Sequence, residues 1–492
     1  HGELRKAKGE YEIYLKLYPA GEAAARVRER LAAIGNPSAD TVSRGRTGSA
    51  SGRPAQWSVN GSVSQYWYSG QSQIEILTPQ PGLSFNRENL SSIDQRALVS
   101  SIDLTARRRD DETDTRAVFR DTHTWNTLPG QADRNRLNAA YVEQTHKVHG
   151  YFVRLGRQPG NAGGVLSRFD GLWAGYNLNT RWRVNGVIGS PVEFTSPYRK
   201  NFHGLSVDLM PQTDRWGGSL YYLQQNTSGI TDRRALGMEA RYFDSRRTLY
   251  LLLDYDLAFR AANIAMAQGN WQSEAKSNFF FLIDHRKSPP FSITNGLIGQ
   301  ALQSLSGYVQ WVGETALREQ AAKLTSRSNL SMIGVTHPVS DRWQLGADVR
   351  VSNVSGTAAA GDMPAGAGTG NILVYSAQAI GNAILRDNDL GVLNLSLIRS
   401  PTYTAHSLSL NYVYLYSDSL RIDGSVRWYG QSDRYGARMS RLTPTVKAIY
   451  KLRERLFLDA EGAIERTTTK APASTEHSRR YFFYTGYRWD IY

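Results

Sequence analysis

The side chains able to catalyse a reaction or bind a metal are few in this sequence. The chain has no cysteine, which excludes thiolate nucleophiles and cysteine-ligated zinc or iron–sulfur sites. His146 and His149 lie three residues apart, a spacing that puts them on opposite faces of a strand and predicts no shared metal. Asp121 and His123 share a face, but such a pair arises easily by chance. We expect no catalytic residue, no metal and no cofactor.

Two short motifs resemble ligand sites in composition only. Residues 160–164 are glycine-rich but lack the lysine and the following helix of a phosphate-binding loop. Asp387-Asn388-Asp389 lacks the twelve-residue ligand pattern of a calcium loop. The sequence therefore predicts that the protein is not an enzyme.

Charged side chains instead recur at every second position, an arrangement that suits the wall of a water-filled pore. In residues 343–352, Leu345 and Val349 face one way while Asp348 and Arg350 face the other. The net charge of +14 favours anions or acidic polymers in such a pore. The predicted pore-lining residues are Arg154, Gln158, Glu239, Arg241, Asp348, Arg350, Arg421, Asp423 and Arg427.

The elements that position these side chains are strands. Two-residue alternation of polar and apolar positions continues through residues 56–492, between short connectors such as 244–246, 340–342 and 451–455. Longer loops are expected at 70–89 and 355–370. The pattern predicts an all-β antiparallel transmembrane β-barrel of roughly 18 strands, within about 16 to 22 and even in number. A soluble sandwich is the alternative; a propeller would need repeats of about 40 to 50 residues, and none is found.

The end of the chain supports the barrel. Residues 481–492 alternate to the last position, with Phe483, Thr485, Tyr487, Trp489 and Ile491 on one face, and they end on Tyr492. This strand resembles the C-terminal targeting signal of Gram-negative outer-membrane proteins. Mean hydropathy is −0.45, and no window contains the roughly 18 apolar residues of a membrane-spanning helix. We expect the Gram-negative outer membrane as the location.

One internal segment, residues 297–324, lacks the strand rhythm. Residues 304–312 and 314–324 read as two short helices broken at Gly313, with Glu314 and Arg318 four residues apart as a helical ion pair. Helices cannot form part of a barrel wall, so the insert lies in the lumen or over a mouth. It is predicted to gate or plug the pore, or else to decorate an extracellular loop. The candidate gate residues are Leu302, Leu305, Tyr308, Trp311, Glu314 and Arg318.

The N-terminal part differs in composition. Residues 1–34 have helical apolar spacing, and Ala7, Tyr11, Tyr14 and Pro19 resemble the second helix and closing proline of a tetratricopeptide repeat (TPR). A simple amphipathic hairpin is the alternative. Residues 35–55 form a Gly/Ser/Arg-rich linker. We expect the segment to be the end of a longer periplasmic repeat region.

A repeat scaffold joined to a C-terminal outer-membrane barrel resembles the bacterial exopolysaccharide exporters for cellulose, poly-N-acetylglucosamine and Pel. The resemblance rests on the half-repeat at residues 7–19 and the terminal strand. It implies that the repeats guide polymer and recruit periplasmic proteins while the barrel conducts the polymer. Arg157, Gln158 and residues 168–171 also resemble stretches of alginate-type and other substrate-selective porins.

The predicted function is therefore polymer export through an outer-membrane channel guided by a periplasmic scaffold. The alternatives are an anion-preferring diffusion porin and a non-conducting anchor for a periplasmic or surface assembly. Expected partners are outer-membrane lipid and lipopolysaccharide, periplasmic proteins, and a polymeric or anionic substrate. Nucleic acid is not expected, because Lys and Arg are scattered at strand spacing and form no long run.

Overall fold

The structure is a computed structural model that describes residues 55–80, 84–160, 163–194, 198–211, 215–300 and 304–492. The described residues belong to the second of two units into which the chain divides, residues 54–492. The predicted TPR-like segment 1–34, and the predicted linker apart from residue 55, lie outside the described residues. The strands of the second unit form one antiparallel sheet.

Twenty-two strands make up that sheet. Their bounds are β1 Gln56–Gln80, β2 Ser84–Arg109, β3 Thr113–Asn126, β4 Arg134–His146, β5 Tyr151–Gln158, β6 Phe169–Asn177, β7 Trp182–Pro191, β8 Lys200–Leu209, β9 Trp216–Thr227, β10 Ile230–Phe243 and β11 Arg247–Asp256. The second half comprises β12 Ala261–Gln272, β13 Asn278–Ser288, β14 Ser326–Pro338, β15 Trp343–Val354, β16 Ile372–Asn382, β17 Asp389–Arg399, β18 Tyr403–Leu415, β19 Leu420–Asp433, β20 Arg438–Arg453, β21 Leu456–Ala471 and β22 Ser474–Ile491.

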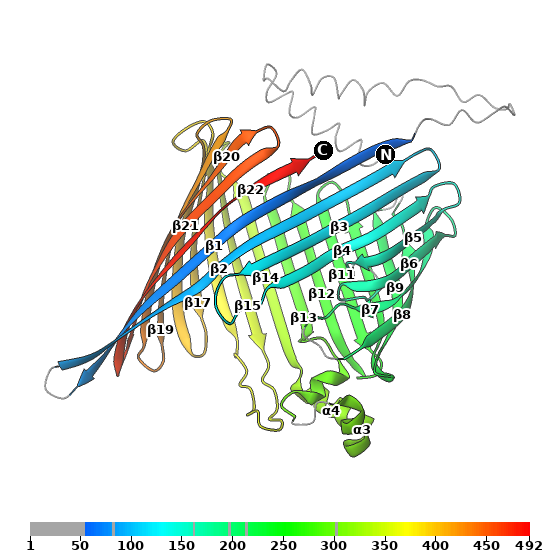
Figure 1. Cartoon of the computed structure of the whole chain (residues 1–492), viewed down its shortest axis with the longest axis horizontal. Coiled ribbons are helices and arrows are strands. Elements are labelled where there is room, and N and C mark those ends of the chain that lie inside the picture. The colour runs from blue at the N-terminus through cyan, green and yellow to red at the C-terminus, as the bar shows by residue number, and fades with distance from the viewer. Residues whose placement is uncertain (1–54, 81–83, 161–162, 195–197, 212–214, 301–303) are drawn as a thin grey trace. The chain divides into compact units, whose positions relative to one another are not determined.

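The sheet closes on itself. Each strand pairs antiparallel with its neighbours in sequence, and β1 pairs with β22, so that Ser64 lies opposite Arg488 (Figure 1). Closure leaves no unpaired sheet edge. The predicted closed barrel is confirmed, with a strand number at the upper limit of the predicted range.

The strand number of roughly 18 was too low, partly because strand lengths vary widely. The predicted loop at 70–89 is wrong: β1 and β2 contain 25 and 26 residues, and only residues 81–83 separate them. By contrast, β5 and β6 contain 8 and 9 residues. One side of the barrel is therefore much taller than the other (Figure 1).

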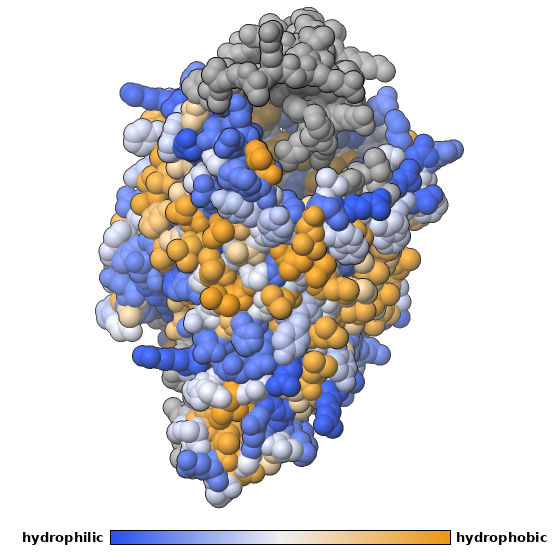
Figure 2. All heavy atoms as spheres, turned by 90° about the vertical axis from the view of Figure 1, so that its right-hand side faces the viewer, coloured by the Kyte–Doolittle hydropathy of each residue, from blue (hydrophilic) through white to orange (hydrophobic). Residues whose placement is uncertain are grey.

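The two faces of the wall differ as the alternation predicts. Val349 and Val426 are 37% and 45% exposed on the outer face, and Phe483 and Trp489 of β22 are exposed on the same face elsewhere around the barrel. Figure 2 shows apolar side chains gathered at mid-height on one side, between more hydrophilic upper and lower zones. The outer face at mid-height is thus largely apolar, and the predicted charged rows of β15 and β19 point inward.

The two ends of the barrel also differ. At the end where β22 finishes, here called the turn end, the connections are short, such as 110–112, 244–246 and 454–455. The opposite end, the loop end, carries the long connections 289–325 and 355–371 (Figure 1). This asymmetry is typical of outer-membrane barrels.

The helical insert follows β13 at the loop end. It contains η1 Ile293–Leu297, α3 Leu305–Val312 and α4 Glu314–Leu324. The two predicted helices and their break at Gly313 are confirmed, since Gly313 adopts φ +84°, which favours glycine. Figure 1 shows α3 and α4 beyond the ends of the strands, at a mouth of the barrel. Of the two predicted positions, lumen or mouth, α3 and α4 occupy the mouth, and gating stays a prediction.

Among the described helices, none combines the length and the apolar composition needed to cross a membrane.

Candidate functional site

The inner face of the barrel wall is the candidate site, because the charged side chains predicted to line a pore lie on it. Glu239 and Arg241 form an ion pair of 2.9 Å on β10, and Arg421 and Asp423 form one of 2.7 Å on β19. These pairs lie on the same strand two residues apart, as their spacing implies. Their charges are neutralised within the wall.

Two other predicted residues are cations without a neutralising carboxylate. Arg350 on β15 and Arg427 on β19 are exposed and follow the outward-facing Val349 and Val426. Within the described residues neither guanidinium forms an ion pair. Asp348 lies on the same face of β15 as Arg350 and makes no ion pair in that part of the chain. The pore-lining role of these three residues stays a prediction.

A row of arginines continues across the short side of the barrel. Arg154 on β5 donates from Nε to Glu143 of β4 at 2.7 Å, and its guanidinium lies 4.9 Å from the Tyr141 ring and 4.8 Å from the Trp173 ring. Contacts with a carboxylate and two aromatic faces hold a planar guanidinium in one orientation. Arg154 is therefore a fixed cation.

Arg116 and Arg183 extend this row but were not identified from the sequence. Arg116 on β3 lies 3.3 Å from Glu143. Arg183 on β7 lies 2.9 Å from Asp208 and 5.2 Å from the Phe152 ring. Arg183 alternates with Trp182 and Val184, so strand spacing alone could have indicated its inward direction. We call Arg116, Arg154 and Arg183 the inner-wall arginine row.

Gln158 does not line a pore. Its side chain is 0% exposed, and its Nε2 donates to the Gly171 carbonyl of β6 at 3.0 Å. Gln158 of β5 is therefore hydrogen-bonded to the neighbouring strand β6 within the wall. Its predicted pore-lining role is wrong. Alternation indicates a direction but not whether a loop covers the position.

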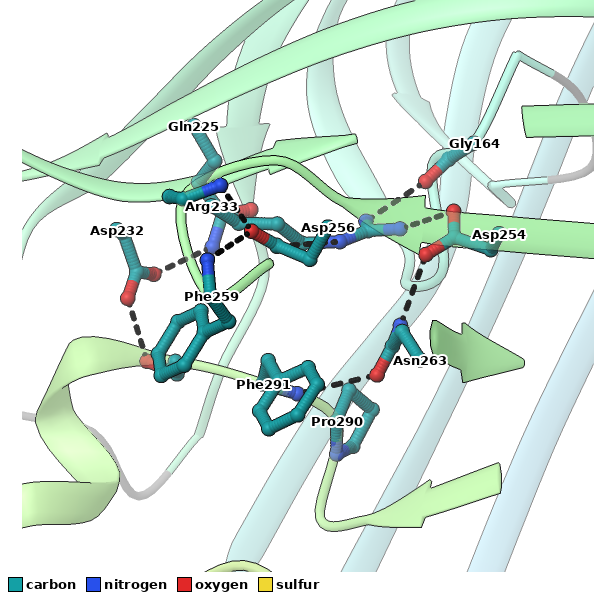
Figure 3. Close-up of polar contacts among 12 residues, drawn as sticks. Gly164, Gln225, Asp232, Arg233, Asp254, Asp256, Phe259, Asn263, Pro290 and Phe291 are labelled. Carbon is teal, nitrogen blue, oxygen red and sulfur yellow. Dashed lines mark hydrogen bonds and ion pairs between the residues drawn. The ribbon is translucent and has the colours of Figure 1, made fainter. Parts of the chain in front are cut away.

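A buried polar cluster forms on the inner side of β9–β12, towards the loop end (Figure 3). Arg233 donates to the Gly164 carbonyl at 3.0 Å and forms an ion pair of 2.5 Å with Asp254. Asp254 also accepts hydrogen bonds from Tyr221 at 2.8 Å and from Asn263 at 3.1 Å. Burial makes these bonds interdependent, because a group that loses its partner stays desolvated.

Two β-bulges bring these side chains together. Registers shift between Thr231 and Arg233 and between Asp254 and Tyr255, which leaves Asp232 and Asn263 as extra residues. A bulge turns a side chain away from the direction that simple alternation gives. The period-2 pattern gives the inward direction of Arg233 and Asp254 but could not indicate that Asp232 and Asn263 join them.

Asp232 attaches the insert to the wall. Its Oδ1 accepts hydrogen bonds from the Ser292 hydroxyl and the Ile293 N–H, both at 2.7 Å, and its Oδ2 accepts one from Gln225 at 2.7 Å. Phe291 N–H donates to Asn263 at 3.2 Å. The start of the insert is thus bonded to β10 and β12, and Gln225 of β9 holds Asp232 in place.

The loop before β6 is held against the inner wall by the same cluster. Gly164 adopts φ +75°, and a Cβ there would lie 2.3 Å from the Tyr221 ring. Val165 packs with Phe169, Phe202 and other inward side chains as a small apolar core. We call residues 163–168 the inner loop, since it narrows the space inside this side of the barrel.

Most of the candidate gate residues stabilise the insert. Leu305 and Tyr308 are buried in its apolar core, whereas Trp311 is 72% exposed. The predicted ion pair between Glu314 and Arg318 is confirmed at 2.6 Å. Arg318 also donates to the Thr231 carbonyl of β10 at 2.7 Å. Leu302 lies outside the described residues.

The remaining motifs have structural explanations. The prediction that His146 and His149 face opposite sides is wrong: β4 ends at His146, and the turn brings the two rings 4.4 Å apart. Asp389 accepts three backbone N–H bonds, from residues 384–386, and the Tyr412 hydroxyl bond, which makes it the cap of a turn.

No family model and no curated protein sequence matches this chain. Among solved structures, it is similar to the ferric enterobactin receptor PfeA of Pseudomonas aeruginosa in complex with BCV-L6, at 12% identity and a TM-score of 0.46 over 88% of this chain and 81% of that one. It is also similar to the siderophore receptor PirA of that organism, at 13% identity and a TM-score of 0.42 over 86% and 80%. The third is OccK2 (OpdF) of that organism, at 10% identity and a TM-score of 0.37 over 87% and 98%. The resemblance to exopolysaccharide exporters stays a prediction.

Proposed function

We propose that the barrel is a channel of the Gram-negative outer membrane that passes hydrophilic solutes with a preference for negative charge. The apolar outer row suits lipid, and the short turns at one end suit the periplasmic side. A wall of 22 strands encloses more space than its own side chains can fill.

The observation that carries the anion preference is the pair of unneutralised inner-face cations, Arg350 and Arg427. Fixed positive charge on a pore wall raises the local concentration of anions. The inner-wall arginine row adds guanidinium groups on the short side, although its carboxylate partners offset part of that charge.

The test is ion selectivity in planar lipid bilayers. Replacing both residues, Arg350→Glu with Arg427→Glu, should shift the reversal potential in a salt gradient towards cation preference. Arg434→Glu, in the exposed turn 434–437, is the control and should shift it less. An unchanged reversal potential in the double variant contradicts the assignment, and absence of any conductance favours the non-conducting anchor.

A second candidate, polymer export, is favoured by an aromatic cluster on the tall side of the barrel. Tyr66 and Tyr68 of β1 lie 5.8 Å and 5.4 Å from Tyr484 of β22, and Tyr68 lies 6.4 Å from Phe482. These four residues alternate with the outward row, and the Tyr66 hydroxyl donates to Asp459 at 2.7 Å. Flat rings with polar tips are suited to sliding contacts with sugars.

This candidate predicts that soluble polysaccharide interrupts the ion current. The double variant Tyr66→Ala with Tyr484→Ala should shorten the interruptions, while Tyr222→Ala on β9 serves as the control. Interruptions of equal length in all three proteins would leave only the diffusion channel.

A further inference from the structure

The outer face of the tall side carries a polar groove near the loop end. It has a volume of about 700 Å³ and is lined by residues of β1, β2, β21 and β22, including Arg466, His477 and Arg479. Arg466 lies two residues from Ile464, and Arg479 lies two residues from Tyr481, so each arginine shares a strand face with an exposed outer-face residue. The groove therefore opens to the surroundings of the barrel and not to its lumen.

The cations of this groove lack carboxylate partners. Arg466 and Arg479 are exposed and lie opposite each other on β21 and β22. Arg438 and Lys470 form the next outward pair, between β20 and β21. None of the four makes an ion pair among the residues that the structure describes, and Glu75 of the groove is paired with Arg87 at 2.9 Å. The patch has an excess of positive charge.

A second, apolar groove lies on the same side of the barrel and shares β1, β21 and β22 with the polar one. Its volume is about 460 Å³, and its lining includes Val446, Gly462, Ile464, Tyr481 and Phe483. A Cβ added at Gly462 would meet no atom within 4 Å, so the groove is open at that point. The apolar part lies nearer mid-height and the basic part nearer the loop end.

The two grooves are one step apart. Ile464 to Arg466 and Tyr481 to Arg479 are each two residues along a strand, or about 7 Å. A molecule that fills both must join an apolar chain to an anionic group over a short distance. Such a molecule is a phosphorylated lipid.

We propose that this surface binds the phosphorylated lipid A portion of lipopolysaccharide, with acyl chain in the apolar groove and phosphate between Arg466 and Arg479. Guanidinium groups bind phosphate oxygens in a geometry that suits both partners. The inference rests on the proposed outer-membrane location, with the loop end outward, where the outer leaflet supplies this lipid.

The first experiment measures lipid A bound per protein by native mass spectrometry, after delipidation and reloading with bisphosphorylated lipid A. The double variant Arg466→Gln with Arg479→Gln should bind on the order of tenfold less, from two exposed charge contacts. Arg480→Gln is the matched control, because Arg480 is adjacent in sequence and faces inward towards Asp94. It should bind as the unaltered protein does.

A second variant tests the apolar groove. Gly462→Leu adds an apolar side chain to the groove at a position where a Cβ meets no atom within 4 Å, and it should lower lipid A binding several-fold. Gly186→Leu on β7 is the control. A Cβ at this position has only an ordinary contact of 3.8 Å, and β7 lies on a different side of the barrel from the two grooves.

Three outcomes overturn the inference: equal binding by the double arginine variant, equal binding of dephosphorylated lipid A, or a dimer that occupies the grooves in place of lipid. Conductance is recorded for the same samples, so that each of these outcomes can occur in a protein that still conducts and leaves the proposed channel function standing. A protein that neither inserts nor conducts would instead overturn the proposed function.

Discussion

At the scale of single residues, the buried polar cluster is the feature of the wall whose stability depends most on exact geometry. Arg233 and Asp254 are almost completely excluded from solvent, and each carries further hydrogen bonds to other elements. Burying a pair of charges costs free energy that only good geometry offsets. The cluster is thus a sensitive point for stability.

Arg233→Met should lower the free energy of unfolding by about 3–5 kcal/mol, because Asp254 would remain buried without its cation. The double variant Arg233→Met with Asp254→Asn should recover part of that loss. Urea unfolding in lipid vesicles measures both. Arg246→Met is the control: its ion pair with Glu274 is exposed, and its loss should cost below about 1 kcal/mol. Equal losses for Arg233 and Arg246 would contradict the expectation.

Asp244 provides a pH test at the turn end. The backbone N–H of Arg246 and the Tyr242 hydroxyl hold the pKa of the Asp244 carboxyl below its usual value. The folded-state pKa is lower than the unfolded one, so the stabilisation is present above the unfolded pKa and disappears as the pH falls through the folded pKa. Asp244→Asn should therefore flatten the loss of stability in acid. An identical pH profile of urea unfolding for both proteins would contradict this.

At the scale of elements, the helical insert depends on a few bonds to the wall. Arg318 of α4 donates to the Thr231 carbonyl and lies 5.1 Å from the Phe259 ring. These contacts join the insert to the β9–β10 and β11–β12 ends, in addition to the bonds of Asp232. Removing them should release the helices while the barrel stays closed.

Arg318→Ala should lower the protection of α4 by about 2 kcal/mol, the usual value for hydrogen bonds from a charged group. Hydrogen exchange of residues 305–324 measures this. Lys323→Ala on the same helix is the control, since the Lys323 side chain is exposed and only its carbonyl accepts a bond. Equal exchange in the two variants would show that Arg318 does not attach the insert.

At the scale of the whole molecule, closure between β1 and β22 is the feature on which the channel depends. Because the chain has no cysteine, an introduced pair reports on closure without interference. Cysteines at Ser64 and Arg488, which are partners in the register, should form a disulfide under mild oxidation. The cross-linked chain migrates differently on denaturing gels.

The control pair places cysteines at Ser64 and Asp490, two residues out of register and on the same face. It should cross-link much less. Equal cross-linking of both pairs would mean that the register is loose, and absence of cross-linking in either would mean that the barrel is open at this seam.

The class of fold follows from local sequence patterns, because a two-residue period is a property of each strand alone. Thus the outward direction of Val349, Val426 and Trp489, and the helices on either side of Gly313, follow from short windows of residues. The terminal strand β22 could be identified in the same way.

The assembled barrel was needed to establish the strand number, the mouth position of the insert and the burial of Gln158. It also decided the bulges at Asp232 and Asn263, and the meeting of Arg154 with Tyr141 and Trp173. The physical reason is that each depends on register and on contacts between segments far apart in the chain. Alternation is unchanged when a strand slips by two residues or a loop folds inward, so it contains no information on these contacts.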